Sequence, residues 1–427
     1  MTLQARKYAH LGGPFTLATC ALCTAAASVA LHHANSRADV GFLPILTWLW
    51  GGALILGAGT LPQSSPARVF AIACVLRFFL VGTPLHLSDD LYRYLWEGKV
   101  LDHDLNPFLL PPSTIHGVDD ALAQKVNHPD IPSIYPPIAL LWFRLLDLIG
   151  GTVVRAQLLT GAVDAAIAAG MASILRYRGK STLWAMVYAL HPLPILESAG
   201  SAHLEPIAIA FSVLSIMAYD RKNTFGAGFF GTLGFGAKLL PGALVPASVR
   251  QHPWRAITGV LLALSLIAAA LSPVLDAGSD LFRAGRNYAE HWSFNGAVFV
   301  PLHLALGAWT RPVLLMIGGG GALWALGERD PLVVWRNVAF FFLLCTPTAH
   351  PWYALWFIVP ALLLGESWAI VLGVAILGGY GVLLSLAEGP WKEQAWLWPL
   401  TWIPIALAWL HWARRPSPPS RNQPKTA

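Results

Sequence analysis

The sequence predicts an all-α polytopic membrane protein, and three observations support this. Of its 427 residues, 56% are hydrophobic and 12% are charged, whereas soluble domains have about 25% charged residues. Apolar segments recur along the chain, and several approach the ~20 residues that a helix needs to cross a bilayer. The 19 tryptophans are typical of proteins whose aromatic side chains anchor helices at membrane interfaces.

The apolar segments predict about 11–14 transmembrane helices. The candidate spans are 14–32, 42–61, 67–86, 153–175, 181–198, 203–219, 254–273, 310–327, 332–348, 352–365, 367–387 and 396–413. Three further apolar segments, 136–150, 225–249 and 297–308, are short or interrupted by charge or proline. We expect these three to be half-helices, re-entrant segments or short spans that line a cavity.

The basic residues predict the orientation of the chain. If the N-terminus is cytoplasmic, the short loops rich in Arg and Lys are cytoplasmic too, as the positive-inside rule requires. Segments 86–135, 273–296 and 386–396 then lie on the external face. The formal net charge of +6 is explained by these loops, so it gives no reason to expect a nucleic-acid partner.

The most polar segment of the chain, 86–137, separates two apolar regions and begins HLSDDLYRYLWEGK. Ser88 is predicted to be the N-cap of a short helix on the membrane surface, with Asp89 and Asp90 in its first turn. The helix dipole favours negative charge at that end. The two aspartates therefore have an alternative role, which is simply to cap and solubilise the helix.

Two motifs place charge where apolar helices meet. HPLPILES followed by SAHLEP carries Glu197, His203 and Glu205, and GAKLLPG carries Lys238. Charged groups at such positions are costly unless they face protein, water or a ligand. The alternatives are a solvated polar turn for the first motif and snorkelling to the interface for Lys238.

A third motif, TPTAHPWY, carries His350, Trp352 and Tyr353. Its alternative role is an interfacial aromatic belt with a helix-breaking proline. Arg77 lies inside an apolar segment, and we expect it to pair with an acid such as Asp164. The sequence has no P-loop, H-E-x-x-H or G-x-S-x-G motif, which disfavours nucleotide, zinc or serine hydrolysis.

The order of these motifs resembles the GT-C superfamily of polytopic glycosyltransferases, which use lipid-phosphate-linked sugars. The pattern runs from SDDLYRYLWEG and IYPP through HPLPILES, SAHLEP and GAKLLPGALVP to WSFNG and TPTAHPWYALW, over residues 67–365. It is most similar to the bacterial family 87 type, which is related to polyprenol-phosphate mannosyltransferases and to the first mannosyltransferase of GPI-anchor assembly. The resemblance implies a GT-C-like helix bundle with an external helical loop after the third span and re-entrant or broken helices.

The resemblance also implies an inverting hexosyl transfer, with mannose as the common sugar, to a lipid-linked or cell-envelope acceptor. Asp89 or Asp90 matches the general base, and the spacing leaves both open. Lys238 matches the lysine of a K-x-x-P element. The candidate ligands of the donor phosphate are the cationic side chains Lys238, Arg93, His350 and His203. The candidate contacts of the sugar or acceptor are Tyr92, Tyr135, Glu205, Asn295, Trp352 and Tyr353. A requirement for Mg²⁺ or Mn²⁺ stays open.

The implied organisation has four parts. Residues 1–66 are N-terminal transmembrane helices, 67–365 the catalytic core with external loop 86–136, 366–413 C-terminal transmembrane helices, and 414–427 a disordered cytoplasmic tail. The implied partners are a polyprenyl-phosphate sugar, a glycan or glycolipid acceptor and membrane lipids. The expected location is the bacterial inner membrane, with the active site facing the periplasm.

The main alternative is a secondary transporter or a flippase for a lipid-linked or anionic substrate, since such proteins also have broken helices and intramembrane charge. The sequence shows no internal repeat, and its polar clusters gather at one predicted surface. A transporter site is expected near the bilayer midplane, so the transferase interpretation is favoured.

Overall fold

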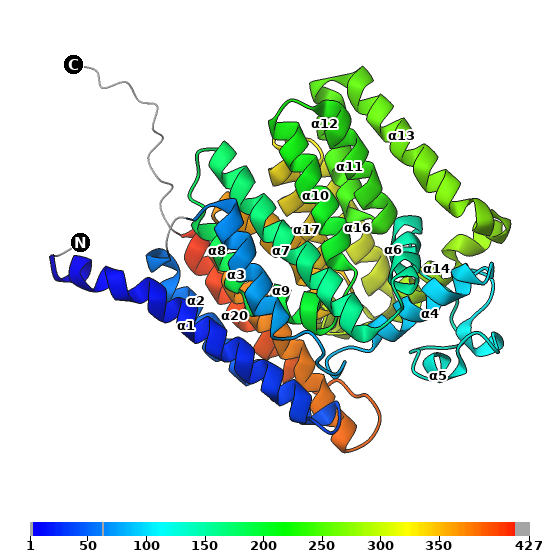
Figure 1. Cartoon of the computed structure of the whole chain (residues 1–427), viewed down its shortest axis with the longest axis horizontal. Coiled ribbons are helices and arrows are strands. Elements are labelled where there is room, and N and C mark those ends of the chain that lie inside the picture. Colours follow the sequence, from blue (N-terminus) through cyan, green and yellow to red (C-terminus); the bar gives the residue numbers. More distant parts are fainter. Residues whose placement is uncertain (1–2, 62–63, 415–427) are drawn as a thin grey trace.

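The computed structural model describes residues 3–61 and 64–414, and the predicted tail after Arg414 lies outside these ranges. Within them, the regular elements are helices, and the isolated bridges of Phe294 and Asn295 with Thr348 are the only strand-like pairings. The all-α prediction is therefore confirmed. Figure 1 shows a bundle of helices, with α4, α5 and α14 together at one side of it.

The helices follow the chain in this order. The first are α1 (Leu3–His33), α2 (Leu43–Gly57), α3 (Pro66–Phe78), α4 (Asp90–Asp102), α5 (Asp120–Ala123) and α6 (Pro137–Leu148). Next come α7 (Val153–Tyr177), α8 (Leu183–Leu190), α9 (Pro192–Ile195), α10 (Glu205–Asp220), α11 (Thr224–Ala237), α12 (Val245–Gln251) and α13 (Pro253–Leu271). The last are α14 (Arg283–His291), α15 (Phe299–Leu306), α16 (Thr310–Ala325), α17 (Pro331–Cys345), α18 (Leu355–Leu364), α19 (Trp368–Ala375) and α20 (Leu397–Ala413).

The chain is a multi-pass membrane protein. Among the described residues, six helical segments are long and apolar enough to cross a bilayer. They are Gly13–His33, Ala38–Thr60, Val153–Tyr177, Pro253–Leu271, Phe299–Ala325 and Trp368–Ala387. A seventh is the pair Pro192–Gly200 and Glu205–Asp220, if these two helices, bent by 119°, form one span. The remaining apolar helices are shorter, so the figure of about 11–14 spans stays a prediction.

Two of the three interrupted segments are short or broken as expected. Segment 225–249 breaks at Lys238, which is extended and ends α11 before a 3₁₀ turn begins at Leu240. Segment 136–150 forms only the 12-residue α6. Segment 297–308 is different, because α15 continues through a 3₁₀ turn into α16 and so belongs to a candidate span of 27 residues.

Helix α4 differs from the prediction at its start. The helix begins at Asp90 with Asp89 as its N-cap residue, so Ser88 lies one position outside it. The Ser88 hydroxyl instead accepts a hydrogen bond from the backbone N–H of Asp90 at 3.3 Å. The helix lies tightly against α6 at Gly98, where a Cβ would come within 2.3 Å of the Phe143 carbonyl oxygen.

The side of α4 that carries Arg93 and Glu97 is buried. Arg93 is 5% exposed and Glu97 is 2% exposed. The Arg93 guanidinium donates to the backbone carbonyls of Asn127, His128 and Ile131 at 2.7–3.1 Å. Loop 127–133 thus wraps over this face of α4, and its carbonyl groups take the place of water around the Arg93 guanidinium.

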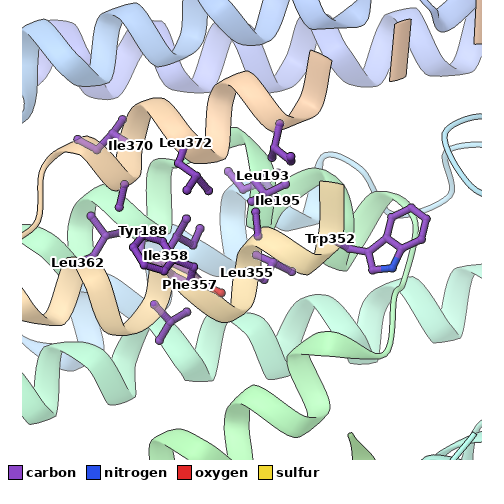
Figure 2. Close-up of a cluster of buried hydrophobic side chains, with 14 of the residues drawn as sticks. Tyr188, Leu193, Ile195, Trp352, Leu355, Phe357, Ile358, Leu362, Ile370 and Leu372 are labelled. Atoms are coloured by element: carbon purple, nitrogen blue, oxygen red, sulfur yellow. The ribbon is translucent and has the colours of Figure 1, made fainter. Parts of the chain in front are cut away.

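The core contains one predicted ion pair and one large apolar cluster. Arg77 pairs with Asp164, with Nε 2.6 Å from Oδ2 and both side chains fully buried, so the predicted pairing is confirmed. Figure 2 shows the apolar cluster, in which Tyr188 of α8 packs beside Phe357 of α18 and Ile370 of α19, with Trp352 at one end. This cluster forms a rigid support beside the polar site described next.

Candidate active site

The two aspartates at the start of α4 have different surroundings. Asp89 forms an ion pair with Arg37 at 2.6 Å, and it accepts a hydrogen bond from the Asn127 amide at 3.1 Å. Asp90 accepts from the same amide at 2.7 Å, while its Oδ2 lies 3.9 Å from Nε2 of His203. Asp89 therefore anchors α4 to segment 34–40, and Asp90 faces the interior cluster.

His203 is fully buried at the bend between α9 and α10. Its Nε2 lies 3.1 Å from the Ser88 hydroxyl, and its Nδ1 lies 2.8 Å from Oε2 of Glu197. The Nδ1–Glu197 approach is an ion-pair contact without the alignment of a full hydrogen bond. The imidazole ring stacks on Trp352, with ring centres 4.0 Å apart.

An unusual backbone path delivers His203 to this position. Leu196–Gly200 form a π-helical turn, in which the Ser201 N–H donates to the Leu196 carbonyl at 2.9 Å. Ala202 follows with a positive φ of 53°, a conformation that costs a non-glycine residue about 1 kcal/mol or more. Both features are frequent at functional sites.

Lys238 meets Glu205 at the break after α11. The ammonium nitrogen lies 3.0 Å from Oε1 of Glu205 and 5.7 Å from the centre of the Tyr353 ring. Glu205 is fully buried, and its Oε2 has no hydrogen-bond partner among the described residues. The Tyr353 hydroxyl is 3.1 Å from that of Tyr288 in α14, which closes the cluster on one side.

Aromatic rings form a wall beside these charges. Trp352 stacks between His203 and His350, with the His350 ring centre 4.3 Å away. Burial, together with the charges of His203 and Lys238 nearby, lowers the pKa of His350 to about 3. His350 is therefore neutral at pH 7 and can offer a hydrogen bond but no positive charge to an anion. Tyr135 lies near this wall, close enough to Tyr353 to interact with it electrostatically.

Three of the predicted site residues are engaged in other contacts. The Arg93 guanidinium is occupied by loop carbonyls, by Glu97 and by Asn127. Tyr92 lies under the Lys125 ammonium, 5.5 Å from its ring centre. The Asn295 side chain donates to Thr401, and its backbone carbonyl accepts from Trp402. The structure therefore does not bring these three side chains into the Asp90–Lys238 cluster.

Sequence reasoning missed two residues that the structure brings into the site. Asn127 binds both Asp89 and Asp90, and the sequence NHP marked it only as part of a polar turn. Tyr380 donates to both Glu197 oxygens at 2.9 Å, yet it lies in a long apolar stretch that gives no signal. No group of three or more metal-ligating side chains occurs among the described residues, so we derive no step through a divalent cation.

Comparison with known proteins places this site in a family. A family profile described as "Alpha-(1->6)-mannopyranosyltransferase, N-terminal domain" matches residues 17–252, which is more than half of the chain. The chain belongs to this family. The matched region contains Asp90, Glu197, His203, Glu205 and Lys238, whereas the aromatic wall at 350–353 lies beyond it.

Two relatives cover most of the chain at low identity. One is alpha-(1->6)-mannopyranosyltransferase B of Corynebacterium glutamicum, which is 24% identical over an alignment of 394 residues. That alignment covers 77% of this chain and 64% of that protein. The other is alpha-(1->6)-mannopyranosyltransferase A of Mycobacterium tuberculosis, which is 24% identical over an alignment of 421 residues. That alignment covers 86% of this chain and 80% of that protein. This chain thus spans less than two thirds of the first relative. No solved structure matches it.

Proposed function

We propose that this protein is a membrane mannosyltransferase that forms alpha-(1->6) linkages. In this proposal it takes mannose from a polyprenyl-phosphate donor, with inversion, and passes it to a glycan or glycolipid acceptor. Family membership and the names of both relatives support the sugar and the linkage. The observation that carries the chemistry is the position of Asp90, which meets His203 inside a cluster that also holds Lys238 and Glu205.

The reaction divides naturally between these side chains. Asp90 accepts the proton of the acceptor hydroxyl as its oxygen attacks the anomeric carbon. Lys238 stabilises the charge that develops on the departing phosphate, as a cation aimed at the leaving group does. Glu205, with one oxygen unpartnered among the described residues, accepts a hydrogen bond from a sugar hydroxyl. Trp352 supplies an apolar face for the ring.

Helix α7 supports an external location for this chemistry. Its 25 residues span about 37 Å, enough to cross the ~30 Å hydrocarbon core of a bilayer. Near its start, Gln157 donates to the carbonyls of Thr83 and Gly200, which lie beside the site. Just after its end, Arg178 pairs with Asp220 and Asp330 in a basic region. The positive-inside rule assigns the Arg178 end to the cytoplasm and the site to the opposite face.

The test uses purified full-length protein in detergent, where vectorial transport cannot be scored. Labelled mannose is offered as polyprenyl-phosphate mannose or as a nucleotide sugar, together with a mannoside acceptor. We expect transfer from the lipid donor and a product whose NMR spectrum shows a 1→6 linkage. The proposal would be overturned if mannose is transferred only from the nucleotide sugar. It would also be overturned if the protein transfers no mannose but moves the lipid donor across vesicle membranes.

A further inference from the structure

Two buried polar residues take no part in the reaction as proposed above. Glu197 is a fully buried carboxylate in the π-helical turn, and the Tyr380 hydroxyl donates to both of its oxygens. Burying a carboxylate costs several kcal/mol unless partners compensate for the lost hydration. The nearest such partner besides Tyr380 is His203, which makes Glu197 a neighbour of the site rather than a part of the distant core.

His203 connects Glu197 to the proposed base. One ring nitrogen lies 2.8 Å from Glu197, and the other lies 3.9 Å from Asp90 and 3.1 Å from the Ser88 hydroxyl. The backbone reinforces this arrangement, because the His203 N–H donates to the Glu197 carbonyl at 2.9 Å. Trp352 stacks on the ring and limits its rotation. Tyr380 therefore donates to Glu197, Glu197 lies in ion-pair contact with His203, and a gap of 3.9 Å separates His203 from Asp90.

We propose that Glu197 positions His203 to receive the proton that Asp90 takes from the acceptor, an inference that rests on the proposed function. The Glu197 carboxylate lies 2.8 Å from Nδ1 and favours the tautomer that carries its proton on that nitrogen, because the negative charge stabilises a proton placed there. The lone pair of Nε2 then faces Ser88 and Asp90. An imidazole in this state is a proton acceptor, and Glu197 balances the charge of the imidazolium that forms.

The step balances as follows. The acceptor O–H bond breaks, its proton goes to an Asp90 oxygen, and the acceptor oxygen bonds to the anomeric carbon. The bond from that carbon to the phosphate oxygen breaks, and the electron pair stays on the phosphate. The proton then moves from Asp90 to Nε2 of His203, which restores the Asp90 carboxylate. After the product leaves, the proton returns through Asp90, whose side chain is 24% exposed, to solvent.

The protonation of His203 depends on the titratable groups that surround it. These groups are Glu197 from the π-helical turn, Asp90 from α4, Glu205 from α10 and His350 from the aromatic wall. Burial opposes the charged imidazolium, whereas the three carboxylates favour it, and of these Glu197 lies in direct contact. Changes at Glu197 should therefore move the acidic side of the pH–rate profile, where a protonated His203 can no longer accept a proton.

The experiment compares pH–rate profiles of kcat/KM for two variants that should shift in opposite directions. In Glu197→Gln the imidazolium loses its carboxylate, so the acid limb should move to lower pH and the rate should fall about 10²-fold. In Tyr380→Phe the Glu197 carboxylate loses a hydrogen-bond donor and binds protons more strongly, so the limb should move to higher pH by about one unit. A merely structural role does not predict opposite shifts.

The matched control is Tyr188→Phe. Tyr188 is equally buried and donates to another buried carboxylate, Asp164, in the apolar core. Its loss should lower thermal stability but leave the acid limb in place. If Glu197→Gln does not fold, the comparison of Tyr380→Phe with Tyr188→Phe decides. If the parent protein is active but both variants keep the same acid limb, or shift it in the same direction, the inference is wrong while the proposed function stands. A parent that transfers no mannose would overturn the proposed function and the inference with it.

Discussion

The different surroundings of Asp89 and Asp90 give the sharpest prediction for the transfer reaction. Asp90→Asn removes the proposed base but keeps the size of the side chain. Losing a general base commonly lowers turnover ~10²–10⁴-fold, which corresponds to about 3–5 kcal/mol in the activation barrier. Binding of the donor should change little, because Lys238 and the aromatic wall stay in place.

Asp89→Asn is the matched control, one residue away on the same helix. The carboxylate of Asp89 is 34% exposed and its partner Arg37 is 30% exposed, and an ion pair of this kind contributes about 0–1 kcal/mol to stability. We therefore expect Asp89→Asn to fold, to melt slightly earlier and to keep its rate within about tenfold, the equivalent of 1.4 kcal/mol.

The assay is single-turnover transfer of labelled mannose from polyprenyl-phosphate mannose, with donor affinity measured separately by quenching of tryptophan fluorescence. If Asp89→Asn loses more activity than Asp90→Asn, the assignment from contacts is wrong. If both variants transfer at the parent rate, the start of α4 is not the catalytic centre.

Three further predictions concern the phosphate site, the core and the orientation. Lys238→Met should raise the donor KM about 10–100-fold, because a charge-assisted contact with the phosphate is lost. His350→Gln should raise the donor KM less than about tenfold, because only a neutral group is lost. Donor titrations compare the two variants. Arg77→Ala should lower the free energy of unfolding by about 3–5 kcal/mol, because Asp164 is left buried without its cation. Replacing both residues with apolar ones should recover part of that loss, as measured by denaturant unfolding. Ser113→Cys in a cysteine-free background should react with an impermeant thiol reagent in intact cells; labelling that requires permeabilised cells would contradict the external position of the site.

Features set by local composition could be predicted from the sequence. The apolar runs predicted membrane helices, and a lysine three residues before a proline predicted the break at Lys238. The pairing of Arg77 with Asp164 followed from the cost of an isolated charge in an apolar segment. In each case the physical cause lies within one segment or in a simple requirement for charge balance.

The roles of individual side chains at the start of α4 required the structure. Asp89 and Asp90 differ because Arg37, 52 residues before Asp89, reaches one of them and His203 approaches the other. Arg93 and Glu97 have the i,i+4 spacing of a solvated helix face, but a loop more than 30 residues later covers them. Such contacts depend on how distant segments meet, and single-sequence patterns do not record this.

The π-helical turn at Leu196–Gly200 sets the position of Glu197 relative to His203. A turn with i→i+5 hydrogen bonds holds one more residue than an α-helical turn in the same place. Removing one residue from this turn should let the helix close normally, and all following residues would rotate by about 100°. The helix would become more regular, but Glu197 would lose its alignment with His203.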